Sequence, residues 1–223
     1  MKKIATIAMA ALVAVSSLSA QTQKEVIKEA KQMDRYTEQL LNEKATKAAR
    51  KAAKQFKKEK WVVAPGHLPI EKQLDRSYQM QLELANDGTQ KWVGADAQSV
   101  GENYDAAKFQ AMELVKINIA GQIQSEISAL VETTVGNSQL PKEQAASITE
   151  TVAASKNAIA AKLGRVIPVV ECYREIAHKG KEVRVLAYYD KSSAMESAKQ
   201  TVREELEKKG DKLHEQLDKL LGF

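Results

Sequence analysis

Apolar residues recur every three or four positions in several stretches of the chain, which is the spacing of one face of an α-helix. These stretches span residues 24–60, 69–82, 104–135, 141–163 and 193–220. Pro69 opens the second stretch, at the helix position where its missing backbone donor does no harm. Ser193 and Glu196 form a capping box at the start of the last stretch. The pattern therefore predicts five helices.

The hydrophobic pattern changes after the fourth predicted helix. Residues 166–176 are rich in β-branched side chains, and residues 183–189 are apolar again after a short connection that contains glycine. Two strands so close in sequence predict an antiparallel hairpin. Pro168 lacks a backbone donor, so it belongs at a strand start, a bulge or a sheet edge. A further strand is predicted over residues 91–100, after a turn signal at residues 86–88.

The first twenty residues have the pattern of a secretory signal peptide. Lys2 and Lys3 form a positive n-region, an apolar stretch of about twelve residues follows, and Ala20 is a small residue at the cleavage point. The stretch is well short of the roughly twenty residues that cross a bilayer as a helix, which disfavours a retained anchor. We expect a mature chain that begins near Gln21, is exported and has no transmembrane span.

The order of these elements indicates the α+β class, because the helices are separated in sequence from a small, mainly antiparallel sheet. We predict that an α-helical hairpin and a C-terminal helix pack on this sheet, after a long basic N-terminal helix. We expect the sheet to bury one face against the helices. The chain is divided accordingly into a signal peptide at 1–20, a basic amphipathic helix at 21–60 and an α+β domain at 61–223.

Positive charge is concentrated in one short segment. The chain has 34 Lys and Arg against 29 Asp and Glu. Residues 44–60 hold eight basic residues against one acidic residue, Glu59. The residues that we interpret as a surface for anionic partners are Lys44, Lys47, Arg50, Lys51, Lys54, Lys57 and Lys58. The other interpretation is a solvated face of a structural helix, which is what charge runs of this kind usually are.

The expected partners of this segment depend on the predicted export of the chain and on the size of the apolar side chains in the segment. Anionic lipid head groups, lipopolysaccharide or acidic client proteins suit an exported chain better than nucleic acid does. The apolar stripe of the segment is mostly alanine, which is too small to insert deeply into a bilayer. Docking of the stripe on a partner helix is therefore favoured.

Composition leaves little material for a catalytic or metal centre. Cys172 is the single cysteine, which excludes an intramolecular disulfide and a thiolate zinc site. His67, His178 and His214 lie far apart, and we expect each to be solvent-exposed. We predict no catalytic residue, no cofactor and no metal site, so the chain is not expected to be an enzyme. Cys172 is predicted to be a buried thiol, with a disulfide-linked dimer as the alternative.

Two carboxylates alternate on one strand of the predicted hairpin. Glu171 and Glu175 fall on the same face of that strand, since side chains alternate along a strand. We interpret them as a solvated face, paired across the hairpin with basic residues. The candidate basic partners are Arg174, Arg184 and Lys181. A carboxylate site is the alternative.

Several of these segments resemble a known family. The residues that carry the resemblance are Tyr104-Asp105-Ala106-Ala107, Ala111, Ile119-Ala120 and Ile123, with the strands 166–173 and 183–189. They are similar to the twenty-kilodalton bacterial outer-membrane lipoprotein family, which includes flagellar outer-membrane accessory proteins, over about residues 90–192. The resemblance implies a small, non-enzymatic α+β envelope domain that assembles with itself or with outer-membrane structures. Gln21 stands where that family has its lipidated cysteine. The resemblance therefore does not imply a lipid anchor for this chain.

These observations together predict a non-catalytic, exported cell-envelope protein. We expect it in the periplasm or peripherally at the outer membrane, where it mediates assembly or protein–protein contacts. The expected partner is a second copy or another envelope protein, with anionic head groups as a further option and no nucleic acid. The alternative function is a periplasmic holdase chaperone for outer-membrane clients. An enzyme built from scattered carboxylates is the third hypothesis.

Overall fold

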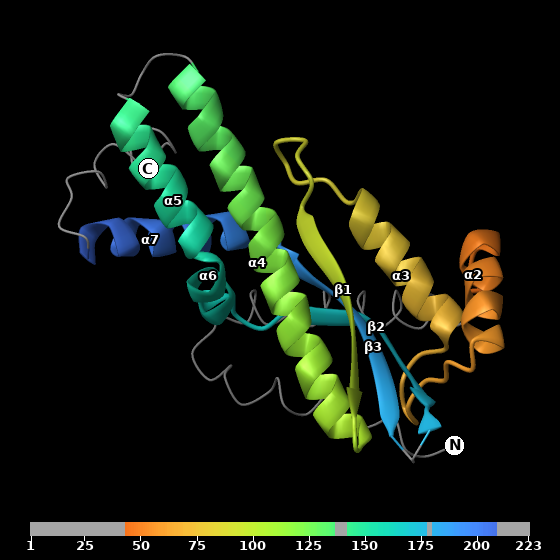
Figure 1. The fold of residues 1–223 in the computed structure, drawn as a ribbon. Helices are drawn as coiled ribbons and strands as arrows, with labels where there is room; N and C mark the ends of the chain where they lie inside the picture. Colours follow the sequence, from red (N-terminus) through yellow and green to blue (C-terminus); the bar gives the residue numbers. More distant parts are fainter. Residues whose placement is uncertain (1–42, 137–141, 178–179, 209–223) are drawn as a thin grey trace, which may run out of the picture. The chain divides into compact units, whose positions relative to one another are not determined.

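The computed structural model describes residues 43–136, 142–177 and 180–208 (Figure 1). The chain divides into two units, residues 1–44 and 45–223, and the fold below is that of the second unit. The predicted signal peptide, most of the predicted helix over 24–60, the connection at His178 and the end of the predicted last helix lie outside the described residues. None of the helices described is long and apolar enough to span a membrane.

Three antiparallel strands form one sheet in the order β1-β3-β2. Strand β1 spans Trp92–Gly101, β2 spans Ile167–Glu175 and β3 spans Lys181–Asp190. The predicted β-hairpin is confirmed, and so is the predicted strand over 91–100. The register shifts between Pro168 and Val170 on the edge strand β2, where a residue without a backbone donor is tolerated.

A long helix covers one face of the sheet. Helix α4 spans Tyr104–Gly136 and contacts β1 and β3 (Figure 1). Its fully buried residues are Ala107, Ala111, Val115, Ile119, Ala120, Ile123, Ile127 and Val131. They form one core with inward-facing strand residues such as Val93 and Val185. The predicted stripe is confirmed except at Leu114 and Leu130, whose side chains are exposed.

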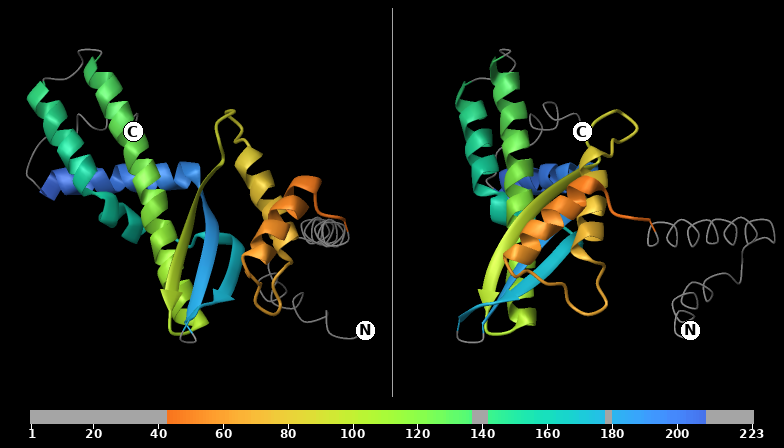
Figure 2. Two further views of the ribbon diagram at one scale, coloured as in Figure 1. Left: turned by 45° about the vertical axis from the view of Figure 1, so that its right-hand side comes forward. Right: turned by 90° about the vertical axis from the view of Figure 1, so that its right-hand side faces the viewer.

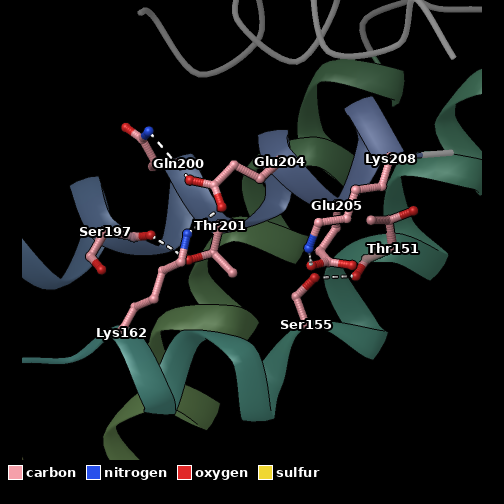
Figure 3. Close-up of polar contacts among 9 residues, drawn as sticks. All are labelled: Thr151, Ser155, Lys162, Ser197, Gln200, Thr201, Glu204, Glu205 and Lys208. Atoms are coloured by element: carbon pink, nitrogen blue, oxygen red, sulfur yellow. Dashed lines mark hydrogen bonds and ion pairs between the residues drawn. The ribbon is translucent and has the colours of Figure 1, made fainter. Parts of the chain in front are cut away.

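The segment predicted as one helix over 141–163 forms two helices, α5 (Lys142–Ala154) and α6 (Lys156–Lys162), with Ser155 between them. The Ser155 hydroxyl donates to the Thr151 carbonyl at 2.7 Å (Figure 3). From α4, the Gln124 amide donates to the carbonyls of Val152 and Ala153 at 3.1 and 2.8 Å. Side chains thus bond the backbone acceptors next to the break.

Helix α7 (Lys191–Lys208) packs against α4, α5 and α6. Its buried face includes Ala198, Val202 and Leu206, as predicted. Lys162 of α6 pairs with Glu204 of α7 (Figure 3). The predicted capping box is wrong, because the helix begins earlier and the Asp190 carboxylate accepts from the Ser193 N–H at 2.8 Å.

The opposite face of the sheet is covered as well, which corrects the expectation of one buried face (Figure 2). Helix α2 spans Lys47–Lys58 and helix α3 spans Ile70–Leu82. Their buried core consists of Ala45, Ala49, Ala53, Trp61, Ile70, Leu74, Val170 and Cys172. The helix predicted after Pro69 is therefore confirmed, but its last residue, Leu82, is 79% exposed.

The part of the predicted 24–60 helix that the structure describes is shorter than the pattern indicated. Residues 43–46 are not helical, and α2 begins at Lys47. The Thr46 hydroxyl accepts from the Ala49 N–H at 3.2 Å, so Thr46 caps the helix. The predicted end of the helix near Lys60 is confirmed, because Lys60 adopts a φ of 65°.

Candidate functional site: the basic face of helix α2

Both ends of α2 are fixed by side chains and backbone of the same unit. At the N-terminus, the Asp75 carboxylate of α3 accepts from the Thr46 N–H at 2.8 Å and from its hydroxyl at 2.5 Å. This carboxylate lies at the positive end of the helix dipole, where α2 has no acidic residue of its own. At the C-terminus, the Trp61 N–H donates to the Phe56 carbonyl at 3.0 Å around Lys60. These contacts fix the helix at both ends.

The inner face of α2 rests on aromatic and arginine side chains above the sheet. The Arg184 guanidinium lies 5.1 Å from the centroid of the Phe56 ring, and Arg174 lies 4.5 Å from that of Trp61. Arg184 also bonds the Asp96 carboxylate of β1 at 2.5 Å. The same bond raises the pKa of the Arg184 guanidinium. The charge of Arg184 beneath α2 is therefore paired with that of Asp96. These contacts hold α2 in one orientation.

The outer face of α2 is a stripe of lysines. Lys47, Lys51, Lys54 and Lys58 are exposed and follow one another at spacings of four, three and four residues. We call these four residues the lysine stripe. They cover about 17 Å of helix, at about 1.5 Å per residue. Helix α2 contains no acidic residue, so no charge within it neutralises the stripe.

The other predicted residues of the basic surface lie at its margins. Arg50 and Lys57 are exposed on one side of the stripe. Lys57 lies 3.7 Å from Glu71, and among the described residues this is the one ion pair made by α2. Lys44, the seventh predicted residue, is exposed and belongs to the unit of residues 1–44. The structure therefore brings together six of the seven predicted residues on α2.

A shallow hollow of about 560 Å³ lies along the other side of the stripe. It is lined by Ala48, Lys51, Ala52, Lys54, Gln55 and Lys58. The alanine side chains form its apolar part, and Phe56 is half-buried among the inner-face residues. The exposed face of α2 thus combines dense positive charge with small side chains.

A second polar cluster surrounds Glu171, which sequence reasoning interpreted as solvated. The Glu171 side chain is only 6% exposed and lies 2.8 Å from the Lys108 ammonium and 3.4 Å from His67 Nε2. The Tyr104 hydroxyl donates to the same carboxylate. In contrast, Glu175 is exposed and pairs with Lys181, as predicted. Of the candidate arginine partners, Arg174 pairs instead with Glu182, at 2.6 Å.

The Glu171 cluster is organised as a structural clamp. Burial, followed by the hydrogen bond to Glu171, raises the pKa of the Tyr104 phenol above its ordinary value, so the phenol stays protonated. The carboxylate is engaged by three side-chain partners, and the Glu171 N–H donates to Gln73 at 2.7 Å. Because these partners come from α3, α4 and the loop before α3, the cluster ties both helical layers to β2.

Two further side chains, Cys172 and His67, were considered as candidates for chemistry. Cys172 is fully buried, which confirms the predicted buried thiol, and burial raises its pKa to about 12. His67 is exposed, as predicted, although it lies beside Glu171. Within the described ranges, no cluster of three or more His, Cys, Asp or Glu side chains could hold a metal ion.

Comparison with known proteins gives no relative for this chain. No family model, curated protein or solved structure matches it. The resemblance noted over residues 90–192 therefore stays a prediction. The lysine stripe and the hollow beside it are the candidate binding surface of the described residues.

Proposed function

We propose that this chain is a non-catalytic, exported envelope protein that works through protein–protein contacts in the periplasm or peripherally at the outer membrane. The observation that carries the proposal is the basic face of α2. Six cations are exposed on a helix that is anchored at both ends. A fixed array of like charges is a surface suited to a partner of opposite charge.

The energetics of α2 support a binding role for this face. Like charges three or four residues apart destabilise a helix by about 0.2–0.5 kcal/mol per pair. The lysine stripe contains three such neighbouring pairs, and the cap at Thr46 and the contact with Asp75 offset their cost. An acidic partner would remove the repulsion, so binding would relieve a strain that the isolated unit carries.

The experiment is co-purification of the tagged chain from envelope fractions after chemical crosslinking. We expect the wild-type chain to recover a crosslinked partner, either a second copy or another envelope protein. Lys51→Glu with Lys54→Glu should lose that partner. Arg76→Glu with Arg165→Glu is the matched control, because it makes the same change in net charge at two exposed residues outside α2.

Three outcomes would count against the proposal. The first is a strict monomer without a crosslinked partner, and the second is recovery of the unprocessed chain from the cytosol. The third is equal loss of the partner in the stripe variant and the control variant. Protection of an unfolded barrel protein from aggregation at near-stoichiometric ratio would instead favour the holdase alternative.

A further inference from the structure

We infer that the lysine stripe of α2 binds an acidic α-helical segment of a partner protein. The inference rests on the proposed function, because it names the partner class for the same surface. It is carried by the spacing of the four lysines, by the alanine-lined hollow beside them and by the charge of the face. The charge requires an anionic partner, and the spacing and the hollow favour a helix over other anionic partners.

The spacing of the stripe matches the seam of two packed helices. Helices that pack along their length meet at residues that alternate three and four apart. Lys47, Lys51, Lys54 and Lys58 have this alternation. A partner helix that presents Glu or Asp at the same spacing places one carboxylate near each ammonium.

The hollow beside the stripe lets a partner backbone come close. Ala48 and Ala52 line it at a spacing of four residues, on the side of α2 away from Arg50 and Lys57. Small side chains permit close approach of two helices, whereas bulky side chains would hold them apart. Gln55 adds an amide at the margin of the hollow, where it bonds Glu59 at 2.7 Å.

A lipid surface fits this face less well. Interfacial helices bury Trp, Phe or Leu in the membrane, and the exposed positions of α2 carry none of these side chains. Phe56, the single aromatic residue of α2, lies against Arg184 on the inner face. The positive charge alone would attract head groups, so vesicle binding is an outcome that the test must separate.

The test uses the full chain, expressed with its own leader and purified from the envelope. The probe is a fluorescent synthetic helix of Ala and Glu in which Glu residues alternate three and four apart. A peptide of the same composition with Glu distributed around the helix is the control probe. Fluorescence anisotropy at low and physiological salt measures both affinities, and phosphatidylglycerol vesicles are tested by co-sedimentation.

We expect the patterned peptide to bind at least about fivefold more tightly than the control peptide. Lys51→Glu with Lys54→Glu should abolish binding, while Arg76→Glu with Arg165→Glu should leave it unchanged. Ala48→Leu, at an exposed position, should weaken peptide binding because it fills the hollow, without weakening adsorption to vesicles. Circular dichroism of each variant checks that the fold is retained.

Equal binding of the two peptides would overturn the inference, and so would vesicle binding without peptide binding. Insensitivity of peptide binding to Ala48→Leu would overturn the role of the hollow. If Lys51→Glu with Lys54→Glu removes the crosslinked envelope partner but neither peptide binds, the proposed function stands and the helical partner class is wrong. The two failures are therefore distinguishable.

Discussion

The ammonium of Lys108 lies 2.8 Å from the carboxylate of Glu171, which is almost completely buried. Lys108 belongs to the first part of α4, and Glu171 belongs to the edge strand β2. Tyr104, one turn before Lys108, donates to the same carboxylate. The contact thus fastens the start of α4 to the sheet edge.

Glu171→Gln should destabilise the fold by about 1–3 kcal/mol, because it removes the acceptor charge and leaves buried donors poorly paired. The loss of stability should be smaller than the loss on breaking a fully buried ion pair, since Lys108 is 34% exposed and can reach water. Urea unfolding measures the change. Glu175→Gln is the control at the exposed position and should stay within about 0.5 kcal/mol of the wild type. Equal effects of the two substitutions would contradict the clamp.

Lys60→Gly should stabilise the chain by about 1 kcal/mol, because Lys60 adopts a left-handed conformation with a φ of 65°. The Lys60 N–H donates to the Lys57 carbonyl at 3.1 Å in this turn. Lys60→Val should destabilise it, since a β-branched residue is least compatible with that φ. Thermal unfolding gives the direction in which each substitution shifts the melting temperature. Shifts in the same direction for both variants would contradict the left-handed conformation at Lys60.

The same Gly→Ala substitution should have opposite effects at two positions. A Cβ at Gly94 would clash with Cε1 of Tyr188, whose ring is held by a hydrogen bond of 2.9 Å to Ser77. Gly94→Ala should therefore destabilise by about 1–3 kcal/mol. Gly121 lies inside α4 and faces the flexible Lys156 side chain, so Gly121→Ala should stabilise by about 0.5–1 kcal/mol. Denaturant titrations of both variants test the contrast.

Asn118→Ala with Gln122→Ala should promote self-association. Strand β1 is an edge strand, and the amides of Asn118 and Gln122 donate to the carbonyls of Asp96 and Gly94 at 3.3 and 2.9 Å. An i,i+4 pair on a helix rises about 6 Å, close to the i,i+2 repeat of a strand, so these amides cover the edge. Removing them exposes a template for strand pairing. Light scattering should report dimers or larger species, and a variant that stays monomeric would contradict a protective role.

Cys172 should react with a thiol reagent only after unfolding. Its pKa of about 12 keeps the thiol protonated at pH 8, and its side chain is fully buried. The folded chain should therefore show no fast labelling by Ellman's reagent, and denaturant should release one equivalent. Fast labelling of the folded chain at pH 8 would show that the thiol is accessible.

Much of the fold follows from periodicity. The stripe of α4 and the strands β1, β2 and β3 were predicted because their apolar positions repeat with helical or strand spacing. Coverage of both sheet faces had a signal as well, since residues 185–189 form an unbroken apolar run, typical of a strand buried on both sides. The run was interpreted only as a strand of the hairpin, so the second layer, formed by α2 and α3, was not predicted.

Other features depend on partners that are distant in the sequence. The break at Ser155 is supported by Gln124, and Glu171 is buried by residues from α4 and from the loop before α3. No local pattern indicates such contacts. The basic face was predicted because it needs only charge and helical spacing, which a sequence contains directly. The cap at Asp190 was missed because Ser193 and Glu196 offered a local match three residues later.

The most direct test of the contact function is a photocrosslinking amino acid in place of Lys51, in the centre of the lysine stripe. The same amino acid in place of Arg165, at an exposed position outside α2, is the control. We predict that irradiation of intact cells links the Lys51 position to an envelope protein or to a second copy, and that the Arg165 position gives no such product. Identical products from the two positions, or none from either, would contradict the account.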